Sequence, residues 1–145
     1  MLDRFERFSY AIFEVARCWH KLAAEVMEPL GLRGPHALYL VVLLRSTHTM
    51  TAARLSEVSG RDKADVSRAI SLMTEKGLIT REGPAYRASL TLTDEGRKVA
   101  NCVCTKAAEL VERAGEGYSE EQRQSFYQVL ETITKNMKIM TKDEE

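Results

Sequence analysis

Residues 51–93 constrain the fold of this chain most, because their pattern predicts two short helices joined by a tight turn. Thr51 is a favourable N-cap for a helix over 52–59, and Gly60 supplies the turn after it. A second helix is predicted over 63–76. Its apolar residues recur at spacings of four and three, which directs one face inward: Val66, Ile70 and Met73. This arrangement indicates a helix-turn-helix.

A β-hairpin is predicted directly after the second helix. Gly77 is placed to end that helix in a left-handed conformation. Strands are expected over 78–81 and 90–93, with a turn at 82–84. A helix-turn-helix followed by a hairpin is a winged helix-turn-helix, which places one helix end in the major groove of DNA. The predicted fold class is therefore mainly α with a small β-hairpin wing (α+β).

Three segments, in this order, resemble the core signature of the MarR family of bacterial transcription regulators: DKADVSRAI at 62–70, EKGLITR at 75–81 and LTLTDEG at 90–96. The resemblance in length and helix layout extends over nearly the whole chain. It implies a dimeric repressor or activator whose winged helices bind a pseudo-palindromic site and whose DNA affinity is often tuned by a small ligand. In the family a very short strand pairs with the wing, and the run at 49–51 would allow it.

Bulk composition fits a single globular domain over 1–145. No apolar run has the length of a membrane span, and the N-terminus lacks the pattern of a signal peptide. We therefore expect a cytoplasmic protein without membrane contact. The net charge is zero, but residues 45–98 carry ten basic side chains against seven acidic ones. Such a modest positive segment is typical of a DNA-binding unit on a separate scaffold.

The first helix, predicted over 3–28, carries a heptad seam of apolar residues. Its members are Phe5, Phe8, Ile12, Val15, Trp19, Leu22 and Val26. Such a seam requires a partner helix, and packing on the chain's own core alone is the open alternative. Pro35 suits the first turn of a helix over 36–45, which is apolar on every side. We expect that helix to be the buried centre of each subunit.

Two further helices are predicted in the C-terminal third. The first is expected over 94–113, with a break at 115–117. Ser119 and Gln122 then form a capping box at the start of the last helix. Its apolar residues again alternate at spacings of four and three: Phe126, Leu130, Ile133, Met137 and Met140. A second seam is therefore present at the other end of the chain.

Seams at both ends predict a homodimer through the N- and C-terminal helices. The expected organisation is a winged helix-turn-helix DNA-binding unit over 35–93, with dimerisation helices over 3–28 and 94–140. With the family resemblance, this implies a transcriptional regulator, interpreted as a repressor, that binds a pseudo-palindromic operator in double-stranded DNA. A small aromatic or phenolic ligand is expected to release the regulator from the operator.

Six residues are predicted to bind DNA: Lys63, Asp65, Ser67, Arg68, Ser71 and Arg87. Arg68 is long enough to pair bidentately with a guanine edge. Arg87 matches a wing arginine that the family inserts in the minor groove, although the aspartate of the family's Asp-x-Arg element is missing here. Asp65 is repelled by phosphate, so pairing with Arg61 or Arg68 is an open alternative. For all six, a merely solvated surface is the other interpretation.

Five residues are candidates for a ligand site: Trp19, His20, Arg33, His36 and Tyr39. They offer aromatic faces beside cationic or hydrogen-bonding groups, which suits an anionic aromatic compound. In the family, aromatic acids and phenols bind where the first two helices meet the DNA-binding unit. The alternative is that Trp19 serves the seam and each histidine is a cap or surface group. No cofactor or metal is expected, and no nucleophile with a placed base indicates an enzyme.

Two alternative functions remain open at this point. The neutral net charge and short wing also fit a winged-helix protein-interaction module without DNA binding. The three cysteines suggest a thiol-based redox sensor. Family members that sense organic hydroperoxides keep their reactive cysteine near the position of Ser9 here, so Cys18 is interpreted as a packing residue. Cys102 and Cys104 lie on different helix faces, and one of them is expected to be exposed.

Overall fold

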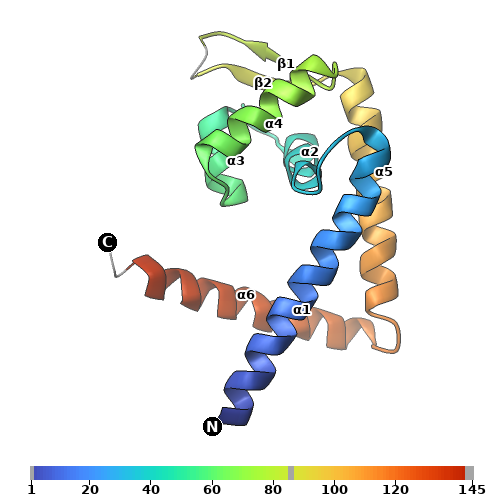
Figure 1. The fold of residues 1–145 in the computed structure, drawn as a ribbon, viewed down its shortest axis with the longest axis vertical. Helices are drawn as coiled ribbons and strands as arrows, with labels where there is room; N and C mark the ends of the chain where they lie inside the picture. Colours follow the sequence, from blue (N-terminus) through green and yellow to red (C-terminus); the bar gives the residue numbers. More distant parts are fainter. Residues whose placement is uncertain (1, 85–86, 143–145) are drawn as a thin grey trace. The chain divides into compact units, whose positions relative to one another are not determined.

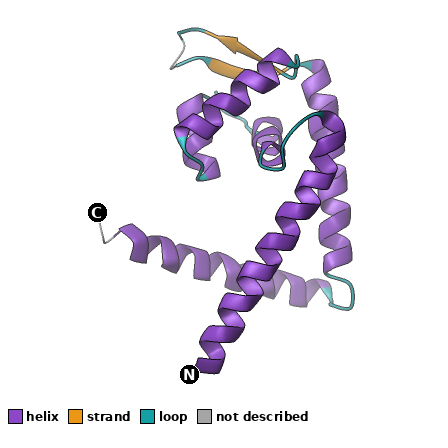
Figure 2. Cartoon of the chain, viewed as in Figure 1, coloured by secondary structure: helices purple, strands orange, loops and turns teal. Residues whose placement is uncertain are grey.

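The computed structural model describes residues 2–84 and 87–142. In order, the elements of this part are α1 (Leu2–Met27), the short helix η1 (Glu28–Leu30), α2 (His36–Arg45), α3 (Ala52–Ser59), α4 (Lys63–Glu75), β1 (Ile79–Glu82), β2 (Ser89–Leu92), α5 (Asp94–Ala114) and α6 (Glu120–Lys142) (Figure 1). Helices dominate and the two strands pair as a hairpin (Figure 2), so the predicted fold class is confirmed. None of the described helices combines the length and apolar character needed to cross a bilayer.

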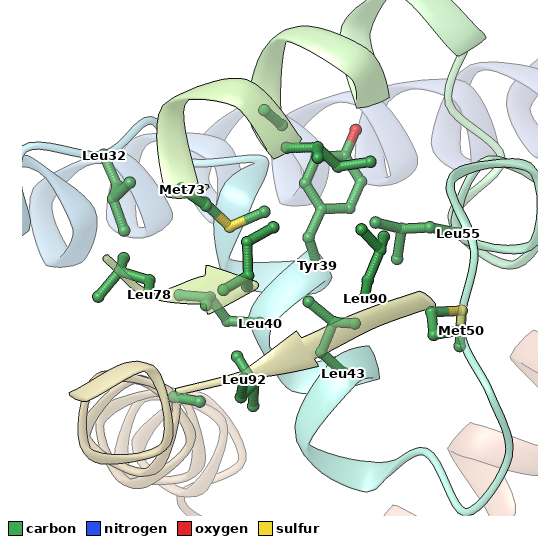
Figure 3. Packing of buried hydrophobic residues seen from close by; sticks show 14 of the residues in the cluster. Leu32, Tyr39, Leu40, Leu43, Met50, Leu55, Met73, Leu78, Leu90 and Leu92 are labelled. Carbon is green, nitrogen blue, oxygen red and sulfur yellow. The ribbon is translucent and has the colours of Figure 1, made fainter. Parts of the chain in front are cut away.

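Two compact units make up the chain, Met1–Ala107 and Ala108–Glu145. The core of the first unit gathers side chains from α2, α3, α4, both strands and the first half of α5 (Figure 3). Its largest fully buried side chains include Tyr39, Met27, Leu40, Leu55 and Met73. Burial of such side chains is the main source of stability in a domain of this size.

Helix α2 is buried along one stripe only. Tyr39, Leu40 and Leu43 lie in the core, whereas Leu38 is 47% exposed and Val42 is half-buried. The expectation that α2 is the buried centre of the subunit holds for this stripe, in which Tyr39 and Leu40 are fully buried, but not for Leu38. A helix buries only the faces that its neighbours cover, and α2 packs against α1, α3 and β2 and bonds to α4 through Tyr39.

Capping residues define the ends of the two helices of the helix-turn-helix. Thr51 accepts the backbone N–H of Arg54 on Oγ1 at 3.2 Å, which begins α3. Gly60 ends α3 with φ of 66°. Asp62 then caps α4 by accepting the N–H of Asp65 at 2.7 Å. Both helices begin where the sequence predicts, because a side-chain acceptor replaces the missing intrahelical partner at each start.

The wing is a short antiparallel hairpin extended by one further residue. β1 pairs with β2 in a register that places Ile79 opposite Leu92. Met50 forms an isolated bridge with Leu90, whose N–H donates to the Met50 carbonyl oxygen at 2.8 Å. The short pairing segment expected at 49–51 is therefore confirmed. Each strand lies within one residue of its predicted range, a difference within the usual uncertainty of strand ends.

Thr93 and Gly96 join the hairpin to α5. Thr93 donates from Oγ1 to the Gly77 carbonyl at 2.6 Å and from its N–H to the Leu78 carbonyl at 3.0 Å. The same hydroxyl accepts the N–H of Gly96 at 3.0 Å, which caps α5. A Cβ at Gly96 would overlap the Leu78 carbonyl group. Glycine is therefore needed at this point, because the backbones of α5 and of the segment before β1 come into direct contact.

The second unit is built from the end of α5 and from α6. The predicted capping box is confirmed: Ser119 Oγ accepts the N–H of Gln122 at 3.2 Å, and Gln122 Oε1 accepts the N–H of Ser119 at 2.9 Å. Arg123 donates to Glu112 at 2.6 Å and to the Gly115 carbonyl at 2.8 Å. These bonds hold the turn between the two helices.

The apolar seams at both ends of the chain are largely exposed. Phe5 and Val15 on α1 are both 68% exposed, and Phe126 and Met140 on α6 are 58% and 68% exposed. Only the C-terminal end of α1 enters the core, through Met27 and its neighbours. The alternative that the first seam packs only on the chain's own core is therefore not what the structure shows.

Candidate nucleic-acid interface

Helix α4 has a buried apolar side and an exposed polar side. Val66, Ala69, Ile70 and Met73 are all buried in the core. The opposite side presents four exposed side chains that the sequence predicted for DNA: Lys63, Ser67, Arg68 and Ser71. The apolar side holds the helix in place, and the polar side can reach phosphates and base edges.

Arg68 is the most accessible cation among the ion pairs of α4. Its side chain is 71% exposed, and its Nη2 lies 3.7 Å from Asp65 Oδ1. An exposed ion pair at this distance costs little to break, because solvent screens most of the attraction. The guanidinium can therefore turn from Asp65 to a guanine edge or a phosphate without a large loss.

Asp65 is already engaged within the protein. Its Oδ2 accepts the Tyr39 hydroxyl at 2.9 Å and the Nε–H of Arg61 at 2.9 Å. The pKa of the Asp65 carboxyl is lowered, first by the hydrogen bond from Arg61 and next by that from Tyr39. Of the two interpretations of Asp65, pairing with a neighbouring arginine is what the structure shows, while a direct DNA contact stays a prediction.

Arg81 is a candidate that the sequence reasoning missed. It lies on β1, and its Nη2 donates to Ser71 Oγ on α4 at 3.3 Å, so it joins the wing to the exposed side of the helix. Strand alternation carried no signal for it, because it would place Arg81 on the face of buried Ile79, whereas all three residues after Ile79 are exposed. Ser71 and Arg81 together extend the polar surface of α4 toward the wing.

Arg87 is exposed near the start of β2, and its N–H donates to the Pro84 carbonyl at 2.9 Å. Residues 85–86, between these two, lie outside the described part of the chain. This places Arg87 in the wing, as the sequence predicts. Its contact with the minor groove stays a prediction.

The five ligand candidates separate into two groups. Trp19 and His20 are exposed on α1, and their side chains make no hydrogen bond or ring contact within the described residues. His36 is buried, accepts the N–H of Arg33 on Nδ1 at 3.0 Å, and stacks on Tyr39 with ring centroids 6.2 Å apart. Burial is the first cause that lowers the pKa of His36, and the nearby Arg33 is the second. Arg33, His36 and Tyr39 thus form one connected group.

A surface hollow of about 560 Å³ lies elsewhere in the first unit. It is lined by the end of α2, the connector that follows and α3, including Arg45, His48 and Val58. None of the five ligand candidates lines it. A ligand role for those five stays a prediction.

The cysteines differ in exposure. Cys18 is exposed, so the interpretation that it packs inside this chain is wrong. It lies on α1, which carries the exposed apolar seam. Cys102 is exposed and Cys104 is half-buried, which confirms that one of the two reaches the surface. The described residues include no group of three or more side chains suited to hold a metal ion.

Comparison with known proteins connects the chain to one family. A model of the MarR family matches residues 30–86, which contain the helix-turn-helix and the first strand of the wing. Over these residues the chain is similar to the MarR family of transcriptional regulators. Its MarR fold is similar to the crystal structure of a MarR transcriptional regulator from Methanosarcina mazei Go1, with a TM-score of 0.82, 24% identity, and 92% of each chain covered.

Two other solved structures share the MarR fold of this chain. A putative MarR-family regulator from Listeria monocytogenes, complexed with a 26mer DNA, has a TM-score of 0.80 and 19% identity, with 88% of this chain and 87% of that chain covered. MarR from Staphylococcus aureus, in complex with salicylate and kanamycin, has a TM-score of 0.77 and 22% identity, with 92% and 95% covered. These likenesses show that the shared fold includes the helices at both ends of the chain as well as the winged unit.

Proposed function

We propose that this protein is a MarR-family repressor that binds a pseudo-palindromic operator as a homodimer. The observation that carries the proposal is the two-sided character of α4. Its apolar side is buried, its N-terminus is capped by Asp62, and its exposed side carries Lys63, Ser67 and Arg68. A helix held in this way presents its first turns to the major groove. The DNA-bound regulator from Listeria monocytogenes, which shares the fold, supports this function.

The homodimer is supported by the exposed seams of α1 and α6. Contiguous apolar side chains on a soluble protein mark interaction sites more often than solvated surface. The spacing of four and three along both helices is that of helices that pack against partners. A two-fold arrangement would present two copies of α4 to successive half-sites. In this proposal, 3–28 and 94–140 are the dimerisation helices and 35–93 is the DNA-binding unit.

The last part of the proposal is that a small aromatic or phenolic compound releases the protein from its operator. Two proteins of this fold support it: Staphylococcus aureus MarR in complex with salicylate, and CouR from Rhodococcus jostii RHA1 bound to p-coumaroyl-CoA. His36 stacks on the aromatic ring of Tyr39, and Arg33 donates its backbone N–H to His36. Because Tyr39 also bonds to Asp65 on α4, a ligand that displaced its ring would disturb the DNA-binding helix.

A gel-shift titration on DNA selected by the protein from a random duplex library tests the function. Wild type should enrich a two-fold symmetric site, and its affinity should fall steeply between two salt concentrations, because bound phosphates release counterions. Arg68→Ala should cost about 1–3 kcal/mol of specific binding. Arg113→Ala, which removes the same charge from the exposed end of α5, should have little effect.

Failure to enrich any sequence would contradict the proposal and favour the protein-interaction module. An equal loss for Arg68→Ala and Arg113→Ala would also contradict it, because net charge and not the surface of α4 would then decide binding. Sedimentation equilibrium of the same samples tests the dimer. A lone subunit at micromolar concentration would refute that part of the proposal.

A further inference from the structure

Tyr39, Arg61 and Asp65 form a polar cluster that joins three separate parts of the first unit. Tyr39 belongs to α2, Arg61 to the turn between α3 and α4, and Asp65 to the first turns of α4. Both donors bond to the same atom, Asp65 Oδ2, each at 2.9 Å. A charge-assisted hydrogen bond of this length is stronger than one between neutral groups. The cluster therefore connects the start of α4 to α2 and to the preceding turn.

The two donors differ in what surrounds them. The Tyr39 ring is fully buried in the core, and Figure 3 shows its hydroxyl oxygen directed away from the core leucines toward α4. The Arg61 side chain is 42% exposed, so its guanidinium lies at the surface beside the N-terminus of α4. Asp65 thus joins a fixed interior group to a cation at the surface.

We infer that Asp65 is a positioning residue of the DNA-binding surface and that Arg61 is a phosphate-contacting residue held in place by it. The inference rests on the proposed DNA-binding function. Asp65 itself gains nothing from approaching phosphate, because like charges repel. The guanidinium of Arg61 has five N–H donors, and the bond to Asp65 uses its Nε–H. A guanidinium held through its Nε–H has the donors of its far edge turned away from the carboxylate, where an external anion can accept them.

The sign of the effect separates this role from simple electrostatics. If Asp65 were only a surface charge near DNA, its removal would strengthen binding, because one repulsive charge would be lost. If Asp65 positions α4 and Arg61, its removal weakens binding to the specific site, although it adds one unit of positive charge. The two models therefore predict opposite changes for the same substitution.

The experiment uses the full chain and a duplex that wild type has selected from a random library, with a scrambled duplex of the same length for non-specific binding. Asp65→Asn should weaken specific binding about tenfold, and Tyr39→Phe, which removes only the hydroxyl, about threefold to tenfold. Arg61→Ala should weaken binding to both duplexes and reduce the salt slope by about one. Glu57→Gln is the matched control, because Glu57 also pairs with an arginine, Arg54, but on α3.

Neutralisation of Glu57 should leave specific binding unchanged or slightly stronger. Far-UV circular dichroism and thermal unfolding of each variant report the folded fraction. A larger fall in specific than in non-specific affinity for Asp65→Asn and Tyr39→Phe supports the inference. The inference is overturned if Asp65→Asn binds the selected site as tightly as wild type or more tightly, or if both affinities fall by the same factor, as general loss of structure would cause.

The double variant Tyr39→Phe/Asp65→Asn gives a second readout. Because both single changes weaken or remove the same hydrogen bond, their effects on specific affinity should not add fully. Additive losses would mean that the two groups act separately and would overturn the inference. Failure of wild type to select any sequence overturns the proposed function and this inference together, whereas normal selection with unaffected Asp65 and Tyr39 variants overturns only the inference.

Discussion

The substitution Gly96→Ala gives a sharp test of the packing between α5 and the segment before β1. In an isolated helix, alanine is favoured over glycine by about 1 kcal/mol, so helix propensity alone predicts stabilisation. The structure predicts the opposite. A Cβ at Gly96 would overlap the Leu78 carbonyl oxygen and lie 2.9 Å from its carbon, and both atoms belong to the backbone and cannot rotate away.

The magnitude follows from the bonds that the overlap breaks. Moving α5 away from Leu78 stretches the Thr93 N–H bond to the Leu78 carbonyl and the Thr93 hydroxyl bond to the Gly77 carbonyl. Each is worth about 1 kcal/mol, and the local overpacking costs about 1–3 kcal/mol. After the helix-propensity gain, Gly96→Ala should lower the free energy of unfolding by about 2–4 kcal/mol.

Urea unfolding at a fixed protomer concentration, followed by far-UV circular dichroism, measures the change. The concentration must be constant because dimer formation would add to the apparent stability. Asn101→Ala, an exposed position on the same helix, is the control and should stabilise slightly. Unfolding of Gly96→Ala at the same or a higher urea concentration than wild type would refute the close backbone contact.

Three further predictions concern stability. Met73 is fully buried on the apolar side of α4, so Met73→Ala should cost about 2–5 kcal/mol in urea unfolding; a loss below about 1 kcal/mol would contradict its place in the core. Ser119→Ala removes the cap of α6 and should cost about 1 kcal/mol, whereas an unchanged urea midpoint would argue against the capping box. Burial lowers the pKa of His36 below its ordinary value of 6.5, so the unfolded chain binds this proton more readily. The contribution of neutral His36 to the free energy of unfolding is therefore complete above about pH 6.5 and is lost as the pH falls. On acidification, the stability of wild type should fall relative to that of His36→Gln. A stability difference between the two proteins that stays constant with pH would contradict the lowered pKa.

Local structure could be predicted from the sequence because its causes lie within a few residues. Thr51 and Asp62 cap the helices that follow them, and Ser119 and Gln122 bond to each other across one helical turn. Hydrophobic periodicity also identified the buried side of α4 and the exposed side that carries Arg68. Each of these features needs only the neighbouring residues and the period of the helix.

The contacts between segments that are distant along the chain were decided by the tertiary structure alone. Tyr39 and Asp65 are 26 residues apart, and only the packing of α2 against the following helices brings the hydroxyl to the carboxylate. The bond from Arg81 to Ser71 likewise depends on the angle between the hairpin and α4. Periodicity shows which face of a helix is buried, but it carries no information on which partner covers that face. For this reason the sequence determined the elements and their polar sides, and the packing of the core determined that Asp65 bonds inward and that Leu38 stays exposed.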